Sequence, residues 1–338
     1  MYSVGYTEGK ELDDTRANWR ENRPRPLVWA AWYPCDAEPE EMTEATTSTN
    51  TALFRMEAVA KNADLSNQKS KFPVVLLSHG TGGSAQSLCW LGTKLAAQGF
   101  ICIAVSHHGN CSIEPYLPEG FVCWWERARD LSLILDKLSL KGPFADRLDL
   151  SDVTAAGFSL GGYTVLSLLG AITNYDLFKG WLASKHQKNT GPKEFPNLSQ
   201  AIPGLMENSE KFRQSMERQG LSYQDHRIKA AVVFAPAPTV RAFEPSSLNS
   251  ITIPVGIMVG QDDQEAPHQD CAVWLKEQCP DMSIELLGET VGHYVFLPEA
   301  TELGLETEPD ICCDPLEVSR RAIHNQATEF VLKTISNH

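Results

Sequence analysis

The sequence predicts an α/β protein in which a mostly parallel central sheet is covered by helices on both faces. Short runs of aliphatic and β-branched residues recur along the chain, and stretches with helical spacing separate them. The runs are continuously apolar rather than alternating with polar residues, which is typical of strands buried on both faces. The 338 residues are 42% hydrophobic and 21% charged. Such a chain can bury a large core, and we expect a single domain over residues 1–338.

The expected elements alternate from the first strand to the last helix. The strands are the aliphatic runs at residues 27–33, 74–78, 101–105, 153–158, 230–235, 255–259 and 283–287. The helices are the stretches whose apolar residues return every three to four positions. They cover residues 85–98, 125–138, 160–169, 269–278 and 318–335.

Two segments interrupt this alternation. Residues 36–70 are polar and predict an excursion over the surface, which leads into a helix-like stretch around residues 53–61. Residues 171–227 are rich in lysine, asparagine, glutamine and glutamate and contain no strand-like run. Because loops of that length without secondary structure are uncommon in compact domains, we expect a mainly helical insertion.

The charge of the chain limits its partners and its location. A net charge of −14 and a pI near 5.1 argue against nucleic acid or an anionic membrane surface, because phosphate groups bind clustered lysine and arginine. No apolar run approaches the roughly 20 residues needed for stable insertion across a bilayer. The N-terminal residues lack the pattern of a signal peptide, which favours a cytoplasmic protein. A secreted or periplasmic protein is the alternative if a leader has been removed.

The cysteines predict neither a disulfide framework nor a metal site. There are nine of them, scattered along the chain, and an odd number favours reduced thiols. A local bridge between Cys271 and Cys279 is the alternative. No C-x-x-C pair and no histidine–cysteine cluster has the spacing of zinc ligands, so we expect no metal.

The segment G-F-S-L-G at residues 157–161 lies between an expected buried strand and an expected apolar helix. A serine hydroxyl is a weak nucleophile, and a sharp strand-to-helix turn presents it where a base can reach it. The flanking glycines relieve the crowding of such a turn, and the helix N-terminus stabilises developing negative charge. The pattern therefore predicts a catalytic nucleophile at Ser159, with a purely structural turn as the alternative.

A base and an acid are expected to follow Ser159, with the acid first along the chain. His293 comes after the strand at 283–287 and a short glycine-containing loop, which predicts the base. Two neighbouring carboxylates follow the strand at 255–259. We favour Asp263 over Asp262, because the acid loops of such sites place a proline four residues further on. Other histidines lie in polar or helical stretches and are expected at the surface: His186, His226, His268, His324 and His338.

Two backbone N–H groups are expected to bind the oxyanion that forms when the nucleophile attacks. One belongs to Leu160, the residue after the nucleophile, and the other to Thr81 in the glycine-rich loop after the strand at 74–78. That loop lacks the Lys-Ser/Thr ending of a P-loop, which argues against a nucleotide. The candidates for the pocket wall are His79, His107, Trp124 and Trp125, with packing in the core as the alternative.

These motifs, with G-H-Y-V-F-L and D-H-R-I-K-A-A-V-V-F-A-P, resemble those of α/β-hydrolases, and more narrowly of the platelet-activating-factor acetylhydrolase and predicted dienelactone hydrolase group. The resemblance implies the α/β-hydrolase fold and assigns the Ser, Asp and His roles to Ser159, Asp263 and His293. Dienelactone hydrolases proper use a cysteine nucleophile, so the serine favours the esterase branch. Residues 171–227 are the least family-like part and follow the nucleophile helix, which predicts a helical cap over the site. A peripheral decoration is the alternative.

We therefore expect a serine hydrolase that cleaves a carboxylic ester of small or medium acyl chain and needs no cofactor. An amide substrate is the close alternative, because the same groups cleave amides once the leaving amine is protonated. A non-catalytic binding protein with this fold is the alternative from another class. The expected partner is a small-molecule ester or amide, and the sequence indicates no oligomeric state.

Overall fold

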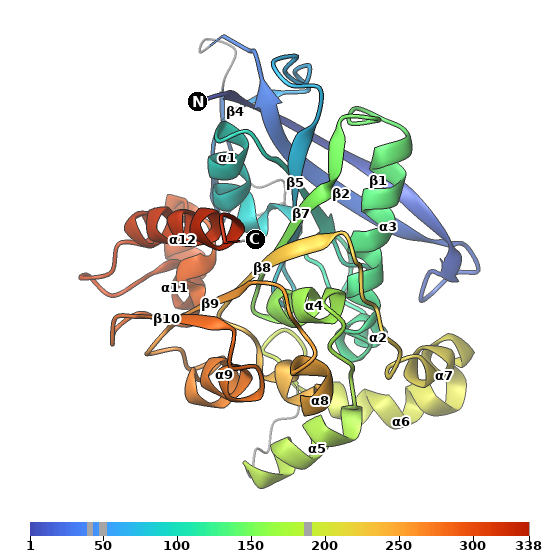
Figure 1. Ribbon diagram of the computed structural model, residues 1–338. Coiled ribbons are helices and arrows are strands. Elements are labelled where there is room, and N and C mark those ends of the chain that lie inside the picture. The colour runs from blue at the N-terminus through green and yellow to red at the C-terminus, as the bar shows by residue number, and fades with distance from the viewer. Residues whose placement is uncertain (39–42, 47–52, 186–190, 338) are drawn as a thin grey trace.

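A single large sheet forms the centre of the molecule. The computed structural model describes residues 1–38, 43–46, 53–185 and 191–337, and within them ten strands pair in the order β10-β9-β8-β7-β5-β6-β2-β1-β4-β3 (Figure 1). The strands are β1 (Ser3–Ala17), β2 (Pro24–Cys35), β3 (Thr43–Thr46), β4 (Arg55–Lys61), β5 (Phe72–Ser78), β6 (Ile101–Ser106), β7 (Leu148–Phe158), β8 (Ile228–Phe234), β9 (Val255–Gly260) and β10 (Ser283–Leu287). Neighbours from β6 through β5 to β10 are parallel, whereas β2 is antiparallel to β6 and β1.

Helices cover both faces of this sheet (Figure 1). On one face α1 (Cys89–Ala97) packs against α12 (Arg320–Ile335), and on the other α3 (Glu126–Leu140) packs against α4 (Leu160–Leu168). The predicted class, a mostly parallel sheet between two helical layers, is confirmed. Further helices of the described residues are α2 (Pro118–Val122), α8 (Pro245–Leu248), α9 (Trp274–Gln278), α10 (Glu302–Thr307) and α11 (Pro309–Cys312). The same residues contain a π-helical turn (Gln269–Val273) and short 3₁₀ helices at Ala85–Leu88, Pro238–Ala242 and His293–Phe296.

The N-terminal part of the sheet differs from the prediction. The expected helix-like stretch at residues 53–61 is wrong, because β4 lies there and pairs in parallel with β1. Its residues, R-M-E-A-V-A-K, favour a helix by propensity, but pairing at a sheet edge overrides local preference. Strand β1 was not expected, because its sequence is largely polar. Its residues from Ser3 to Asp13 pair in unbroken antiparallel register with β2. Of the predicted polar excursion at 36–70, residues 39–42 and 47–52 lie outside the described residues, and residues 43–46 form β3.

The long insertion after α4 contains three helices among its described residues. They are α5 (Tyr175–Ser184), α6 (Leu198–Asn208) and α7 (Glu210–Glu217). The indole N–H of Trp125, which precedes α3, donates hydrogen bonds to the carbonyl and hydroxyl oxygens of Ser215 in α7. This contact fastens the insertion to the body of the domain.

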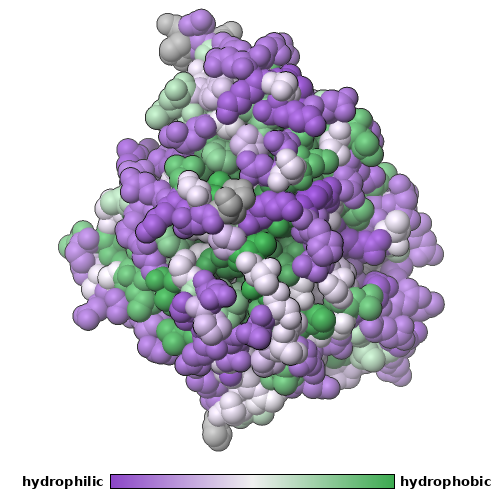
Figure 2. All heavy atoms as spheres, viewed as in Figure 1, coloured by the Kyte–Doolittle hydropathy of each residue, from purple (hydrophilic) through white to green (hydrophobic). Residues whose placement is uncertain are grey.

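The surface seen in Figure 2 is mostly hydrophilic, with scattered hydrophobic patches. Among the described residues, no helix is long and apolar enough to cross a membrane. All nine cysteines are free, so Cys271 and Cys279 form no bridge. The described part of the chain also contains no group of three or more histidine, cysteine or acidic residues placed to hold a metal ion.

Candidate active site

Ser159 occupies a sharp turn between β7 and α4 at the carboxyl end of the sheet. Its backbone has φ 55° and ψ −117°, a conformation that costs a residue with a side chain on the order of 1–3 kcal/mol. The glycines on either side are required by close contacts. A Cβ on Gly157 would lie 2.2 Å from the carbonyl oxygen of Gly161, and one on Gly161 would lie 1.9 Å from that of Ser78. The sequence thus folds into a strained turn that holds the hydroxyl at the edge of the sheet.

His293 begins a short 3₁₀ helix after β10, and its side chain reaches back to Ser159. Its Nε2 lies 3.1 Å from the Ser159 hydroxyl oxygen, and its Nδ1 lies 2.7 Å from Oδ2 of Asp263. A neutral imidazole whose Nδ1–H donates to a carboxylate leaves Nε2 free to accept a proton from the serine. The structure therefore brings the predicted nucleophile, base and acid into one hydrogen-bonded chain.

The two candidate acids differ in burial and in partners. Asp263 is 3% exposed, and its Oδ1 accepts hydrogen bonds from the backbone N–H groups of Glu265 and Ala266, at 3.0 and 2.7 Å. Its other oxygen is thereby directed at His293. Asp262 is exposed and accepts a hydrogen bond only from Gln264 among the described residues. The geometry favours Asp263 as the partner of the histidine.

His324 supports the loop that carries His293, and it was wrongly expected at the surface. It is 2% exposed and stacks on Trp90, with ring centroids 4.1 Å apart. Its Nε2–H donates to the carbonyl oxygens of Val295 and Leu297, each at 3.0 Å. Burial lowers the pKa of His324 to about 3. His324 lies on the buried face of α12. Its neighbours in the sequence are largely polar, so the sequence alone indicated an exposed residue.

The loop after β5 lies against the Ser159 turn. A Cβ on Gly80 would lie 3.2 Å from that of Ser159, and Thr81 and Leu160 both line the cavity that contains Ser159. The N–H of Gly82 donates to Oδ1 of Asn110 at 2.8 Å, and the Tyr116 hydroxyl donates to the Gly82 carbonyl at 2.9 Å. The peptide that follows Thr81 is therefore fixed beside the nucleophile.

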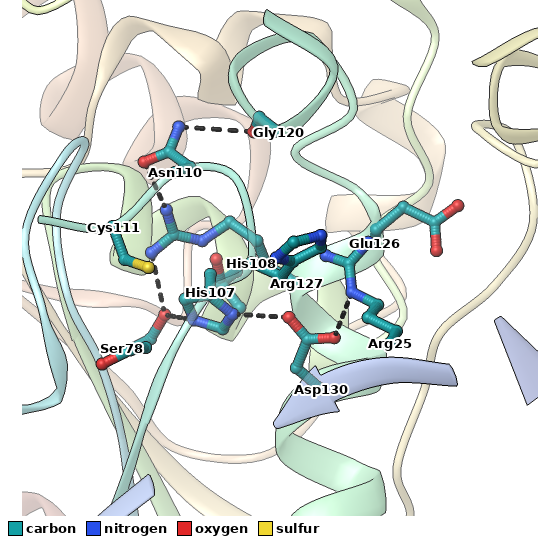
Figure 3. Close-up of polar contacts among 12 residues, drawn as sticks. Arg25, Ser78, His107, His108, Asn110, Cys111, Gly120, Glu126, Arg127 and Asp130 are labelled. Carbon is teal, nitrogen blue, oxygen red and sulfur yellow. Dashed lines mark hydrogen bonds and ion pairs between the residues drawn. The ribbon is translucent and has the colours of Figure 1, made fainter. Parts of the chain in front are cut away.

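A buried arginine contacts the same loop, and Figure 3 shows its guanidinium between Asn110 and Ser78. Arg127 from α3 is 1% exposed and donates to the carbonyl oxygen of His79 and to Oδ1 of Asn110. Burial lowers its pKa to about 9, while the nearby Asp130 carboxylate opposes that shift. Asn110 is oriented in turn by the Gly120 carbonyl, which accepts a hydrogen bond from its Nδ2 at 3.3 Å. Arg127 and Asn110 therefore fix the loop on both sides of Thr81.

Three of the four residues proposed for the pocket wall lie elsewhere. His107 is 1% exposed; it contacts Ser78 through Nε2 and Asp130 through Nδ1, and burial lowers its pKa to about 3. His79 lies next to it and accepts a hydrogen bond from the His107 N–H. Trp125 is buried under the insertion. His107, with His79 beside it, packs behind the site against Ser78 and Asp130, whereas Trp125 contacts Ser215 and Tyr175 of the insertion. Of the four residues, Trp124 lines the cavity.

Known proteins of similar structure and sequence share this fold or match part of the chain. A solved ferulic acid esterase from Streptomyces cinnamoneus matches the whole chain over 90% of its own length, with a TM-score of 0.64 and 18% identity. The chain therefore has the α/β-hydrolase fold. The family described as platelet-activating factor acetylhydrolase, isoform II, matches residues 39–120 of the chain. Two cutinases of Thermobifida alba, est2 and est1, are 27% and 26% identical over 125 residues, or 34% of the chain. The match covers 38% and 39% of the cutinases' lengths.

A cavity of about 1220 Å³ opens above Ser159. Ser159 and His293 line it, and they are only 8% and 7% exposed, so the reacting groups lie at its floor. One wall is aromatic and comes from α2, Trp124 and the insertion. Its members are Phe121, Trp124, Phe178 and Trp181, joined by Leu182 and Leu198. Residues of the insertion thus form part of the cavity that contains Ser159.

Asn110 offers a test of how the loop is held. Substitution Asn110→Ala is expected to lower kcat for ester hydrolysis about 10- to 100-fold with KM within about threefold, because the N–H of Thr81 loses its alignment. Binding of a boronic acid, which mimics the tetrahedral intermediate, should weaken by a similar factor. The exposed Asn325 supplies the control Asn325→Ala. A loss of thermal stability with unchanged kcat in Asn110→Ala would show that Asn110 only supports packing.

Proposed function

We propose that this α/β-hydrolase is a serine hydrolase that cleaves carboxylic esters of small or medium acyl chain. The observation that carries the proposal is the hydrogen-bonded chain from Asp263 through His293 to Ser159, at the floor of a cavity. The names of the similar proteins support ester hydrolysis, since they are cutinases, a ferulic acid esterase and an acetylhydrolase family.

The geometry supports a two-step acyl transfer. Oγ of Ser159 attacks the carbonyl carbon while Nε2 of His293 takes the hydroxyl proton, and Asp263 holds the imidazole in the required tautomer. The carbonyl oxygen becomes an oxyanion next to the N–H groups of Thr81 and Leu160. Each such donor contributes about 3 kcal/mol in the transition state. His293 then protonates the leaving alcohol. In the second step His293 takes a proton from the water that attacks the acyl-enzyme, and it returns a proton to Oγ of Ser159 as the carboxylic acid leaves.

The cavity supports a substrate of moderate size. Its volume of about 1220 Å³ is slightly above the roughly 300–1,000 Å³ of typical small-molecule sites. An acyl group and an alcohol group therefore both fit. The aromatic wall of Phe121, Trp124, Phe178 and Trp181 offers an apolar surface to one of them. We assign this wall to the acyl group, which is uncharged in an ordinary ester.

A fluorophosphonate probe tests this proposal. The folded protein is expected to react with it at Ser159, as identified by peptide mass spectrometry, because the phosphonate mimics the tetrahedral intermediate. Ser159→Ala should remain unlabelled. The protein should also hydrolyse p-nitrophenyl acetate and butyrate faster than the hexadecanoate, and faster than the matched p-nitroanilides. Absence of labelling in folded protein would contradict the proposal, and faster turnover of the anilides would favour the amide alternative.

A further inference from the structure

Glu194 places a carboxylate next to the loop that carries Thr81. It lines the same cavity as Ser159 and His293. A Cβ on Gly82 would lie 2.9 Å from Cγ of Glu194 and 3.3 Å from its Oε1, so the carboxylate stands directly over this glycine. Within the described part of the chain, no other side chain forms a hydrogen bond or ion pair with it. A carboxylate is thus left without a counter-ion where substrate must lie.

The segment that carries Glu194 is fastened at its neighbours. Lys193 pairs with Glu265 at 2.7 Å, and its ammonium lies 5.4 Å from the centre of the Tyr294 ring. Phe195 packs against Phe121, with ring centroids 5.6 Å apart. Tyr294 directly follows the proposed base, His293, and Glu265 lies two residues after the proposed acid, Asp263. These contacts of Lys193 therefore fix the position of its neighbour Glu194 relative to the reacting groups.

The charges around Glu194 leave the cavity negative. Lys193 is the single lysine or arginine among the described residues that line it, and Glu265 already pairs with that lysine. Glu308 and Asp310 also line the cavity from the start of α11. Glu194 is exposed, yet partial desolvation by the surrounding cavity, together with the charge of Glu265, raises its pKa. A cation next to Glu194 would offset the desolvation and the repulsion by Glu265, because an opposite charge favours the ionised carboxylate.

We propose that Glu194 selects substrates by charge, favouring esters that carry a protonated amine and disfavouring esters that carry a carboxylate. This inference rests on the proposed function, since it concerns the same cavity. Although Glu194 is exposed, a carboxylate that lines the cavity lies within a few ångströms of a bound substrate's charge, and at that separation salt screens the interaction less than it screens distant surface charges. Glu194 is therefore a specificity-determining residue and takes no part in proton transfer.

Two isosteric pairs of esters separate charge from shape. The first is 2-(dimethylamino)ethyl acetate, protonated at pH 7, and neutral 3-methylbutyl acetate. The second is 4-acetoxybutanoate, an anion, and neutral 4-methylpentyl acetate, so the charge of both pairs lies on the alcohol group. For each pair, the ratio of kcat/KM for the charged ester to that for the neutral one is measured by pH-stat titration. Wild type is compared with Glu194→Gln, so the intrinsic reactivity of each ester cancels.

Glu194→Gln is expected to lower the ratio of the cationic pair about 5- to 10-fold and to raise the ratio of the anionic pair by a similar factor. The control Glu329→Gln removes an exposed carboxylate on α12, away from the cavity, and should leave both ratios within twofold. Salt at 0.5 M should reduce the discrimination by wild type.

The outcomes separate this inference from the proposed function. If wild type and Glu194→Gln hydrolyse all four esters with the same ratios, charge selection is wrong and the esterase proposal stands. An equal loss with all four esters would mean that Glu194 supports the loop, which also overturns the inference. If wild type hydrolyses no ester and Ser159 is not labelled by the fluorophosphonate, the proposed function fails and the inference falls with it.

Discussion

Replacing Ser159 by alanine is expected to lower kcat/KM for p-nitrophenyl acetate by about 10⁴- to 10⁶-fold while the protein stays folded. The reason is that Oγ is the atom 3.1 Å from Nε2 of His293, and without it neither proton transfer nor acyl-enzyme formation takes place. Turnover by the variant at high enzyme concentration tests the loss of activity. Its thermal unfolding curve tests whether the protein stays folded.

A glycine at the same position provides the matched control. Ser159→Gly should be as inactive as Ser159→Ala, yet more stable than it by about 1 kcal/mol, because glycine tolerates the φ of 55° and alanine does not. Denaturant unfolding of the two variants gives the difference. A glycine variant less stable than the alanine variant would show that the turn is not strained, and activity within about 100-fold of wild type in either one would remove Ser159 from the mechanism.

Much of the sheet could be predicted because its strands are buried on both faces. The central strands β5 to β9 are continuous aliphatic runs, and such runs have few alternative structures once they are flanked by turn residues. Strands β1 and β4 lie toward the edge, where one face meets water, so their residues are polar or favour helices. Their structure depends on pairing with β2 and with each other, and pairing between distant segments leaves no local pattern.

The candidate site shows the same division. Ser159, Asp263 and His293 each follow a strand at the carboxyl edge of the sheet, so chain order was enough to group them. Asn110, in the turn after β6, and Arg127, in α3, support the loop that carries Thr81. No sequence motif connects either residue with Thr81. One signal was present: Asn110 stands close to His107, in a loop that also follows a strand. Glu194 could not be found, because the insertion has no pattern that says which of its carboxylates faces the cavity.

The neighbouring aspartates give the sharpest test of the proposed acid. Asp263→Asn is expected to lower kcat about 10⁴-fold. The amide would present an N–H₂ group to Nδ1 of His293, and the ring would then carry its proton on Nε2, where it cannot accept one from Ser159. Backbone hydrogen bonds from Glu265 and Ala266 to Oδ1 can persist in the variant, so the loss should fall on kcat rather than on folding. Steady-state kinetics with p-nitrophenyl acetate and a thermal melt measure the two separately.

Asp262→Asn is the matched control, one residue away in the same loop. Asp262 is exposed, and an asparagine keeps the Oδ1 that accepts from Nε2 of Gln264 at 2.9 Å. Activity should stay within twofold of wild type, and stability within about 0.5 kcal/mol. If Asp262→Asn lost more activity than Asp263→Asn, the carboxylate next to His293 in the structure would not be the one that orients it. The contrast between two adjacent carboxylates isolates the hydrogen bond to Nδ1 from every general effect of removing a negative charge from this loop.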